Sequence, residues 1–456
     1  MSSSNRYLDH VREEIPAAYP LSAIVSHGEG SVSGQSPIRI ATPSTQWAYA
    51  ASIPLQVHRL PSDLLTVDPV LISVTVTVEH GSVGLGLVDS DQNTFVAEIY
   101  ADASVEREQH FVVFGPLSSG YRFIVRNVSN SGTPTVLLLH ELRVFRFVLP
   151  PIPDTLEPPE DLRLAPTPGW NRFYGSGVAD LGSQVRAWYF SRLTTPKLMP
   201  WLSGLRLMIY PGAEIYRVIY VSGVYEPNSM IAARQLLPEG GVFVDVGASM
   251  GLFSLVAART VGPSGRVFSF EPSTRDFKRL AEHLELNRLD NVKATHLAIA
   301  DSIGSATLTI ASEAHSGHNT IGSAFGHQGI EAIGAERVRT TTLDHFLDCH
   351  EVNRLDLVKL DIEGSELKAL SGMRGAFERL RPSLMFEVFE AALEINGASV
   401  DALEAILKEY RYSLWDIDDA TARLTPLSRL SVSRSENVVA LPLERQADLL
   451  ACTGVG

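Results

Sequence analysis

Cysteine is scarce in this chain. Its 456 residues include two cysteines, Cys349 and Cys452, too few for a disulfide framework or a cysteine-rich metal site. No apolar run approaches the length of a membrane span, and residues 1–10 lack the apolar core of a signal peptide. These absences exclude a disulfide-stapled scaffold and favour an intracellular protein, which we expect in the cytoplasm with no membrane span.

Positive charge is also in short supply. The chain has 38 Lys and Arg against 52 Asp and Glu, so its formal net charge is −14. Nucleic acids and anionic membranes are bound through basic surfaces, so we expect neither as a partner. What the chain does contain is 45% hydrophobic residues, enough for packed cores, over a length that predicts two or three domains. The sequence leaves the oligomeric state open.

The strongest local pattern lies at residues 242–253. Val242–Val246 is a short β-branched and apolar run, typical of a strand buried on both faces of a parallel sheet. A glycine turn follows from Gly247 to Gly251, and an apolar helix opens at Leu252. A strand, a tight turn and a helix in this order present backbone N–H groups to a ligand at the carboxyl end of the strand.

The turn does not have the spacing of a dinucleotide site. The Rossmann fingerprint is G-x-G-x-x-G, whereas here Asp245-x-Gly247 is followed by three residues and then Gly251. A carboxylate at the turn repels phosphate. It suits a cationic, phosphate-free cofactor with a ribose and an amino-acid portion, such as S-adenosylmethionine. Glu271 ends the next predicted strand, where an acid can accept both ribose hydroxyls. The alternative is a glycine turn that only closes a βα unit.

The N-terminal part changes character three times. Residues 1–35 are polar and then rich in glycine and serine, so we expect a tail. Residues 36–148 contain short β-rich segments at even spacing, which predicts an antiparallel, jelly-roll-like β-sandwich. Residues 149–203 begin rich in proline and read as a linker and bridging segment. The β-rich region is expected to bind carbohydrate or a partner. Its candidate stacking residues are Trp47, Tyr49, Tyr100 and Tyr121, although aromatics in sandwiches more often belong to the core.

Residues 204–456 alternate strand and helix patterns, which predicts an α/β domain with a doubly wound, mostly parallel sheet. Such sheets bind ligands at the carboxyl ends of their strands. Asp245, Glu271 and Asp361 fall at or near predicted strand ends, so we expect them to face one crevice. The polar segment 311–336 has no periodicity, and a loop of that length inside a compact domain is commonly functional.

Taken together, the motifs of this half resemble the FkbM family of class I S-adenosylmethionine-dependent methyltransferases. The resemblance spans roughly residues 204–443 and implies a seven-stranded class I methyltransferase fold. It usually implies O-methylation, of sugars or macrolide-type natural products, without naming one substrate. The motifs that carry it are Asp245-Val-Gly-Ala-Ser-Met-Gly251, Phe270-Glu271-Pro272, Ala298-Ile-Ala-Asp301 and Lys359-Leu-Asp-Ile-Glu-Gly-Ser-Glu366, with Gly223-Val-Tyr-Glu-Pro227 as a lead-in. Ser249 and Met250 depart from the residues that many members carry there.

The resemblance also implies which residues bind S-adenosylmethionine. Gly247 and Gly251 let the backbone approach the amino-acid portion of the cofactor, and Asp245 lies beside that turn. Glu271 holds the ribose hydroxyls, and the segment from Leu297 to Ala300 flanks the adenine. The predicted cofactor-binding residues are Asp245, Gly247, Ala248, Gly251, Glu271, Pro272 and Ala298.

The acceptor side is less defined. Asp361 and Glu363 are the acids expected to meet the acceptor or act as the base, and their alternative role is to cap the next helix. A divalent ion between them is a further alternative, but no full ligand set is visible and we predict no metal. His318, near His315 and His327 in the loop, is a second candidate base. The predicted catalytic residues are Asp361, Glu363 and His318.

We therefore expect an S-adenosylmethionine-dependent O-methyltransferase acting on a hydroxyl of a sugar or glycan. One alternative is a methyltransferase for a lipid or polyketide-like natural product, which an apolar acceptor pocket would favour. Another is a degenerate methyltransferase fold used as a binding module. The intact Asp245, Gly247, Gly251 and Glu271 speak against that second alternative.

Overall fold

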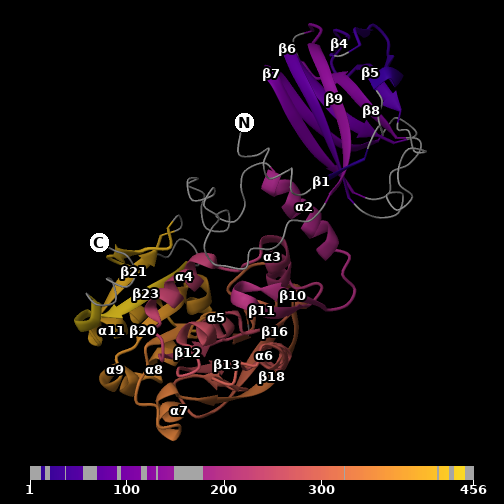
Figure 1. The fold of residues 1–456 in the computed structure, drawn as a ribbon. Coiled ribbons are helices and arrows are strands. Elements are labelled where there is room, and N and C mark those ends of the chain that lie inside the picture. Colours follow the sequence, from indigo (N-terminus) through magenta and orange to yellow (C-terminus); the bar gives the residue numbers. More distant parts are fainter. Residues whose placement is uncertain are drawn as a thin grey trace. The chain divides into compact units, whose positions relative to one another are not determined.

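Two compact units make up the described part of the chain (Figure 1). The first contains the described residues up to 147 together with 178–189, and the second contains those from 190 onward. The computed structural model describes residues 12–15, 21–35, 37–54, 69–89, 94–114, 121–129, 132–147, 178–322, 324–418, 421–430 and 436–446.

The first unit is built on one antiparallel sheet of nine strands. Its order is β2-β5-β8-β6-β9-β4-β3, with β1 paired to β9 and β7 paired to β6. The predicted two-sheet sandwich is therefore wrong, because this single sheet curls into a nearly closed barrel. The strands are β1 (Arg12–Ile15), β2 (Val25–Ser26), β3 (Ser31–Ser33), β4 (Ile38–Ala41), β5 (Tyr49–Pro54), β6 (Val70–Val88), β7 (Phe95–Val113), β8 (Arg122–Asn127) and β9 (Val136–Phe147).

The near-closure of the barrel can be followed in the strand order. β2 and β3 lie at opposite ends of that order, yet only residues 27–30 separate them in the chain, so the two sheet edges approach each other. The 19-residue strand β6 pairs with β7 along its length, and on its other side first with β9 and then with β8. Its register breaks around Gly81, whose φ is +82°. Alternating strands bury one face in a sandwich and in a barrel alike, so periodicity did not distinguish the two.

The second unit carries a mixed sheet of eight strands in the order β14-β13-β12-β19-β20-β23-β21-β22. The first five are parallel, and β23, β21 and β22 are antiparallel to their neighbours. The resemblance predicts seven strands; the eighth, β22 (Leu424–Leu427), is a short edge strand paired only with β21. The others are β12 (Val242–Val246), β13 (Arg266–Phe270), β14 (Val292–Thr295), β19 (Leu357–Leu360), β20 (Ser383–Val388), β21 (Tyr412–Ile417) and β23 (Glu436–Pro442).

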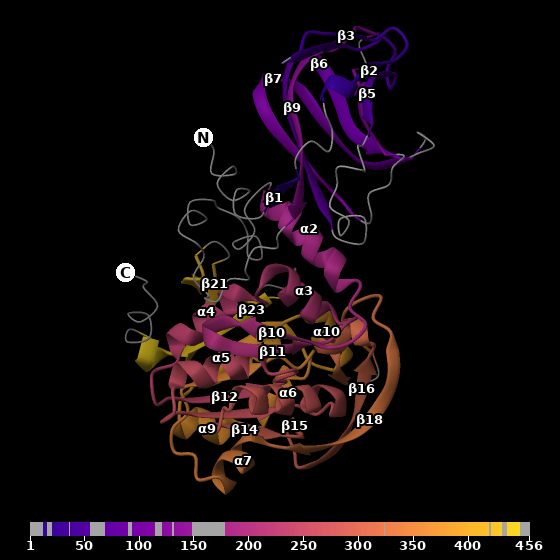
Figure 2. The ribbon, with the colours of Figure 1, turned by 45° about the vertical axis from the view of Figure 1, so that its right-hand side comes forward.

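Helices cover this sheet on both sides (Figure 2). Side chains of α7, α8, α9 and α11 share one buried cluster with the strands, including Phe270, Phe346, Leu370, Phe386 and Leu403. No helix in the described part of the chain is long and apolar enough to cross a membrane. The helices are α2 (Val178–Phe190), α3 (Glu214–Ser222), α4 (Pro227–Leu236), α5 (Leu252–Val261), α6 (Thr274–Asn287), α7 (Leu343–Cys349), α8 (Glu366–Ser371), α9 (Arg374–Arg379), α10 (Glu390–Ile395) and α11 (Val400–Glu409).

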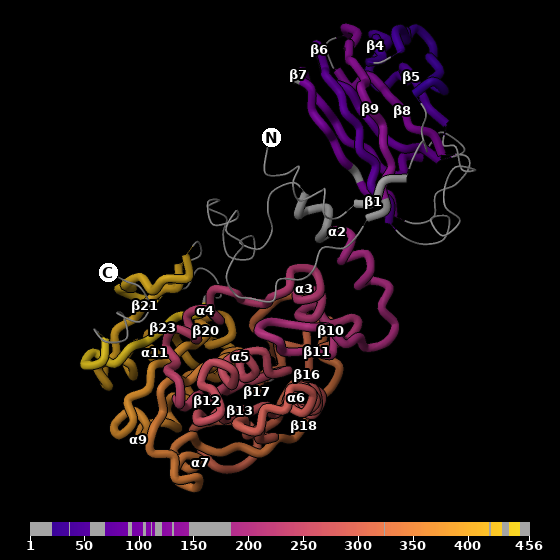
Figure 3. The backbone as a smooth tube through the Cα atoms, viewed as in Figure 1, coloured from indigo at the N-terminus to yellow at the C-terminus, as the bar shows by residue number. Residues whose placement is uncertain are grey.

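A smaller sheet, in the order β15-β18-β16-β17, flanks the larger one (Figure 3). The predicted loop 311–336 supplies part of it, so the segment is more ordered than its composition indicates. Asn319 Nδ2 donates to the Asp276 carboxylate at 2.6 Å and Arg279 pairs with Glu313 at 2.7 Å, which ties the segment to α6. The elements of this sheet and its connection are β15 (Ala298–Ile299), β16 (Gly304–Ala311), the 3-10 segment η7 (Glu313–His318), β17 (Thr320–Ile321) and β18 (Ala332–Thr341). β10 (Lys197–Trp201) and β11 (Leu205–Ile209) form a separate two-stranded sheet.

Candidate functional site

Strand register places the central site residues side by side. Val246, the last residue of β12, pairs with Phe270 of β13 on one side and with Leu360 of β19 on the other. The residues that follow these three are Gly247, Glu271 and Asp361. Parallel pairing in this register therefore brings the turn and two carboxylates to one edge of the sheet, as the strand-end positions predict.

The glycine turn meets the end of β19 very closely. Gly247 has a φ of +80°, and a Cβ there would overlap the carbonyl oxygen of Asp361, so the position accepts only glycine without strain. Gly251 has a φ of +93° and forms the N-cap of α5. A Cβ at Gly251 would meet the side chain of Leu280 instead, so this second glycine serves the packing of α6 rather than the wall of a cavity.

Glu271 ties the turn to the start of α6. One carboxylate oxygen accepts the N–H of Ser249 and the other accepts the N–H of Ser273, each at 2.8 Å. The side chain is buried, and burial together with the nearby charge of Asp276 raises the pKa of Glu271 to about 8. Ser273 is also the N-cap of α6, where its hydroxyl accepts the N–H of Asp276 at 3.3 Å.

Asp245 lies deeper, within β12. Its Oδ2 accepts the hydroxyl of Ser254 at 2.6 Å, and Ser254 in turn bonds Ser269 at 2.6 Å. Its Oδ1 is buried and has no hydrogen-bond partner among the residues that the structure describes. Burial raises the pKa of Asp245, although the nearby positive charge of Lys359 acts in the opposite direction. An orphaned acceptor in a buried carboxylate indicates that a ligand group completes it.

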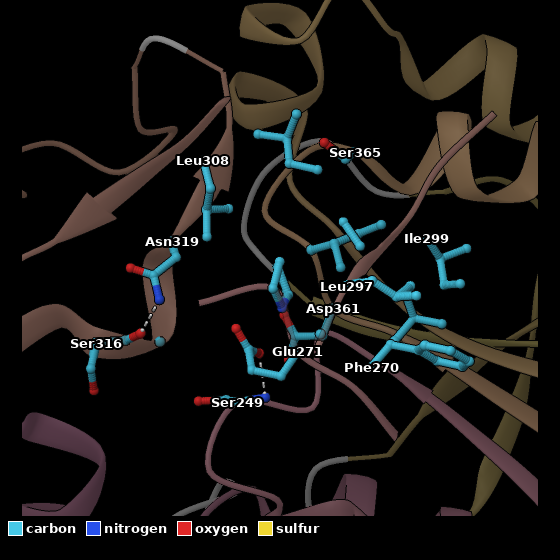
Figure 4. Close-up of a pocket in the computed structure, with 17 residues that line it drawn as sticks. Ser249, Phe270, Glu271, Leu297, Ile299, Leu308, Ser316, Asn319, Asp361 and Ser365 are labelled. Carbon is cyan, nitrogen blue, oxygen red and sulfur yellow. Dashed lines mark hydrogen bonds between the residues drawn. The ribbon is translucent and has the colours of Figure 1, made fainter. Parts of the chain in front are cut away.

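The first cavity opens at this edge and has a volume of about 520 Å³ (Figure 4). Glu271 and the Ser249 turn form its polar side. Its other wall is apolar and includes Phe270, Leu297 and Ile299. Such a slot suits a flat, weakly polar ring with a hydroxylated group at one end. Of the predicted cofactor residues, Gly247, Glu271, Pro272 and Ala298 line it.

A second cavity of about 900 Å³ adjoins the first. The two cavities share the lining residues Gly247, Ser249, Gly317 and Asp361. The predicted residues Asp245, Ala248, His318 and Glu363 line this second cavity. Its lining is strongly acidic, with one lysine. The charged lining residues other than histidine are Glu214, Glu226, Asp245, Lys359, Asp361, Glu363 and Glu387.

Lys359 is the centre of charge compensation in the second cavity. It lies on β19 opposite Asp245 of β12, is buried, and places its Nζ 2.7 Å from Asp361 Oδ2 and 4.4 Å from the centre of the Phe253 ring. Burial alone would lower the pKa of Lys359, but the carboxylates of Asp361, Asp245 and Glu226 outweigh it and raise that pKa. The ammonium therefore stays charged and holds these carboxylates together.

A histidine–glutamate pair lies at the far side of Asp361. His318 Nδ1 is 2.6 Å from Glu363 Oε1, and burial lowers the pKa of His318. Burial and the charge of Asp361 raise the pKa of Glu363 to about 8. Glu363 has a φ of +52°, and its carbonyl accepts bonds from Thr320 Oγ1 at 2.9 Å and Asn396 Nδ2 at 3.3 Å. Neighbouring elements thus hold an unfavourable backbone conformation at this position.

Sequence reasoning missed several residues of the second cavity. Glu226 and Tyr225 belong to the lead-in motif, which was used as a mark of resemblance and not as part of a site. Lys359 stood in the strand motif, and Glu387 follows Phe386, which pairs with Leu360. The signal for Glu387 was its place at the end of the next parallel strand. Gly251, by contrast, was predicted to touch the cofactor and lines neither cavity.

The aromatic candidates of the barrel separate into two kinds. Trp47 and Tyr100 are exposed, at 49% and 57% of their surface, whereas Tyr121 packs partly buried against the barrel core. The Arg126 guanidinium lies 4.6 Å from the Trp47 ring centre and 4.2 Å from that of Phe95. Trp47 has a φ of +67°, and its N–H donates to the carbonyl of the buried Asn127 at 2.6 Å.

Glu366 makes the stability of the second unit depend on pH. It is buried at the start of α8, where its Oε1 accepts the N–H groups of Ile362 at 3.1 Å and Gly364 at 3.3 Å. Burial raises its pKa to about 7 despite these bonds. The folded state therefore keeps a proton between about pH 4.5 and 7 that the unfolded state has lost, so this residue lowers stability as pH rises through that window.

We expect Glu366→Gln to flatten the pH dependence of unfolding in that window and to raise stability near pH 7 by on the order of 1–3 kcal/mol, because glutamine keeps the acceptor without the ionisation. Urea unfolding of the second unit at several pH values measures this. Glu378→Gln, at an exposed position of α9, is the matched control. Parallel pH profiles for wild type and Glu366→Gln would contradict the assignment.

Comparison with known proteins identifies the family of the methyltransferase-like part of this chain. The profile of the methyltransferase FkbM domain matches residues 245–414. Methyltransferase sdnD of Sordaria araneosa is 26% identical over 200 residues, which cover 39% of this chain and 74% of that protein. Hexuronic acid methyltransferase AglP of Haloferax volcanii is 25% identical over 198 residues, covering 43% of this chain and 74% of that protein.

Among solved structures, a putative methyltransferase of Streptococcus mutans in complex with SAH aligns with 46% of this chain and 94% of that chain, at 11% identity and a TM-score of 0.28. Such a score carries no argument about the site, so the assignment depends on the sequence match. That match begins at Asp245 and contains the glycine turn, Glu271, Asp361 and Glu363. Residues 245–414 of this chain are therefore an FkbM-family methyltransferase domain, dependent on S-adenosylmethionine.

Proposed function

We propose that this chain transfers a methyl group from S-adenosylmethionine to a hydroxyl of a sugar or glycan. The observation that carries the proposal is the set of six carboxylate residues that line the second cavity, next to the first one at the glycine turn. A lipid or polyketide-like acceptor would leave those carboxylates without hydroxyl partners. The relative AglP, named as a hexuronic acid methyltransferase, is consistent with a sugar acceptor.

The residues present fit the cofactor. Bound S-adenosylmethionine supplies a methyl group activated on a sulfonium. Glu271 would accept the ribose hydroxyls, and Ala298 with its neighbours would line the adenine. Gly247, Ala248 and Asp245 would hold the amino-acid portion of the cofactor. Its amino group could donate a hydrogen bond to Asp245 Oδ1, which has no partner among the described residues. A sulfonium also offsets part of the negative charge of the second cavity.

Asp361 is the proposed proton acceptor. It lines both cavities, so it lies where the acceptor hydroxyl and the activated methyl group have to meet. The oxygen–methyl bond forms as the sulfur–methyl bond breaks, and the hydroxyl proton passes to the Asp361 carboxylate. Lys359 positions that carboxylate through an ion pair at 2.7 Å. Glu363 and His318 would contact the acceptor from the other side, and alignment of the two reactants supplies most of the remaining acceleration.

The charge of the second cavity narrows the acceptor. Six carboxylate residues and one lysine among its lining residues repel an anion, so a neutral hydroxylated sugar fits better than an acidic one. The proposed acceptor, a neutral sugar, therefore differs from the hexuronic acid named for AglP. A purely structural use of the fold is disfavoured, because it would leave the buried Asp245 acceptor, the raised Glu271 pKa and the buried lysine without a role.

The barrel is proposed to hold the glycan on which the methyltransferase domain acts. Trp47 and Tyr100 offer exposed ring faces for stacking, and the Glu98–Arg126 pair beside them offers hydrogen bonds to hydroxyls. The strained Trp47 backbone, held by the Asn127 carbonyl, supports a functional reason for this exposure. With this role, residues 36–148 are the binding domain, 149–203 the connection and 204–456 the catalytic domain.

We expect Glu271→Ala to weaken S-adenosylmethionine binding by about 1–3 kcal/mol, through loss of its hydrogen bonds to the ribose hydroxyls. Calorimetric titration of the folded variant measures it. Glu285→Ala, exposed on α6, is the control and should bind as wild type does. Unchanged affinity in folded Glu271→Ala would reject the ribose assignment.

Asp361→Asn should lower turnover about 100-fold or more while sparing cofactor affinity, because the proton acceptor is lost and the glycine turn is not. Formation of S-adenosylhomocysteine with a panel of neutral sugars and glycans as acceptors measures turnover. Asp301→Asn, an exposed acid, should leave turnover intact. Equal activity of Asp361→Asn and wild type would place the proton acceptor elsewhere.

Trp47→Ala should raise KM for an oligomeric glycan acceptor several-fold with little change in kcat, because it removes a stacking surface far in sequence from the reacting groups. A monosaccharide acceptor should show a smaller change. Val25→Ala, at another exposed apolar position of the barrel, is the control. If KM for every acceptor stays at the wild-type value, the barrel has another role.

A further inference from the structure

The second cavity contains two overlapping groups of side chains with the chemistry of metal ligands. His318, His327 and Glu363 can place one ligand atom each within 4.8 Å of one another, and Asp361, Glu363 and Glu387 can do the same. Glu363 belongs to both groups. The five residues come from the 311–336 segment, the end of β19 and the strand β20, which are distant in sequence.

The imidazole groups distinguish this cluster from a collection of acids. His318 lies with its Nδ1 2.6 Å from Glu363 Oε1. The rings of His318 and His327 have their centres 4.8 Å apart, and His327 is stacked on Phe389 at 4.3 Å. A ring held on one face by an aromatic neighbour is restricted in the directions that its nitrogens can take. Both histidines are partly buried.

The distances are close to those that one ion requires. Ligand atoms that share an ion at about 2.1 Å lie about 3–4 Å from each other. The present spread of up to 4.8 Å is wider than this, so the two histidine side chains would have to close on a bound ion. Glu363 needs no movement of its backbone, since Thr320 and Asn396 hold its carbonyl in place.

The excess of carboxylates over basic side chains in the second cavity favours a bound cation. Lys359 is the one lysine or arginine among the described lining residues, and it is already engaged with Asp361. The sulfonium of the cofactor adds a single further positive charge. Carboxylates in excess of this, in a buried setting, repel one another unless a cation or a proton lies between them.

From this arrangement we propose that His318, His327 and Glu363 bind a divalent transition-metal ion, with Glu387 or Asp361 able to complete the coordination. Two imidazoles and a carboxylate suit zinc, manganese, iron or cobalt, whereas magnesium and calcium prefer oxygen ligands alone. This inference rests on the proposed methyl transfer to a hydroxyl. The ion orients the acceptor oxygen toward the activated methyl group and lowers the pKa of its hydroxyl, and Asp361 takes the proton.

The test uses the full chain, stripped with a chelator and titrated with Co²⁺ and with Zn²⁺. We expect about one ion per chain, and a visible Co²⁺ spectrum that reports nitrogen and oxygen ligands. His327→Gln and Glu363→Gln should each lower affinity at least 10-fold. His315→Gln should not, since that ring bonds Ser312 and is absent from both ligand groups although it lies in the same 3-10 segment. S-adenosylmethionine titration checks that each variant is folded.

Three outcomes would overturn the inference. The first is no stoichiometric binding of either ion to the stripped wild-type chain. The second is equal ion affinity in His327→Gln, Glu363→Gln and His315→Gln. Methyl transfer that persists in the stripped chain, without bound metal, would reject the ion and leave the proposed function standing. Ion binding with no methylation of any sugar would have the opposite meaning, since it would retain the metal site and reject the acceptor class.

Discussion

The site depends on the register between three parallel strands. Because Val246 pairs with both Phe270 and Leu360, the glycine turn after β12 lies between the residues that follow β13 and β19. A shift by one residue on either side would turn Glu271 or Asp361 to the opposite face of the sheet. Gly247 marks how tight this junction is, since any side chain there would strike the Asp361 carbonyl. The first and second cavities share four lining residues for this reason.

Burial of charge is the second constraint, and it links the cavities to the strand core. Lys359 and Asp245 face each other across β12 and β19, and Lys359 extends to Asp361 at the rim. Without that ammonium, the carboxylates of the second cavity would be pushed toward protonation, as already happens to Glu363. A sulfonium cofactor, and in our inference a divalent ion, would complete the balance.

The two units differ in how much of their fold local sequence patterns could predict. Short alternating segments identified the N-terminal β-rich region but led to a sandwich, because one-sided burial is common to a sandwich and to a nearly closed barrel. Only pairing between distant strands, such as β6 with both β8 and β9, distinguishes them. In the catalytic half, helix caps and strand ends are local. The N-cap at Ser273 is such a local feature, whereas the edge strand β22 depends on its pairing with β21.

The sequence alone determined the cofactor chemistry, since the glycine spacing, the acid at the turn and the acid after the second strand are adjacent features of one βαβ unit. It also identified Asp361, Glu363 and His318 as candidates, from strand ends and loop composition. The tertiary structure decided which groups meet. It brought His318 to Glu363 from another part of the chain, and it placed His327 beside His318 within one segment. Such contacts depend on sheet order and loop packing, which no local period encodes.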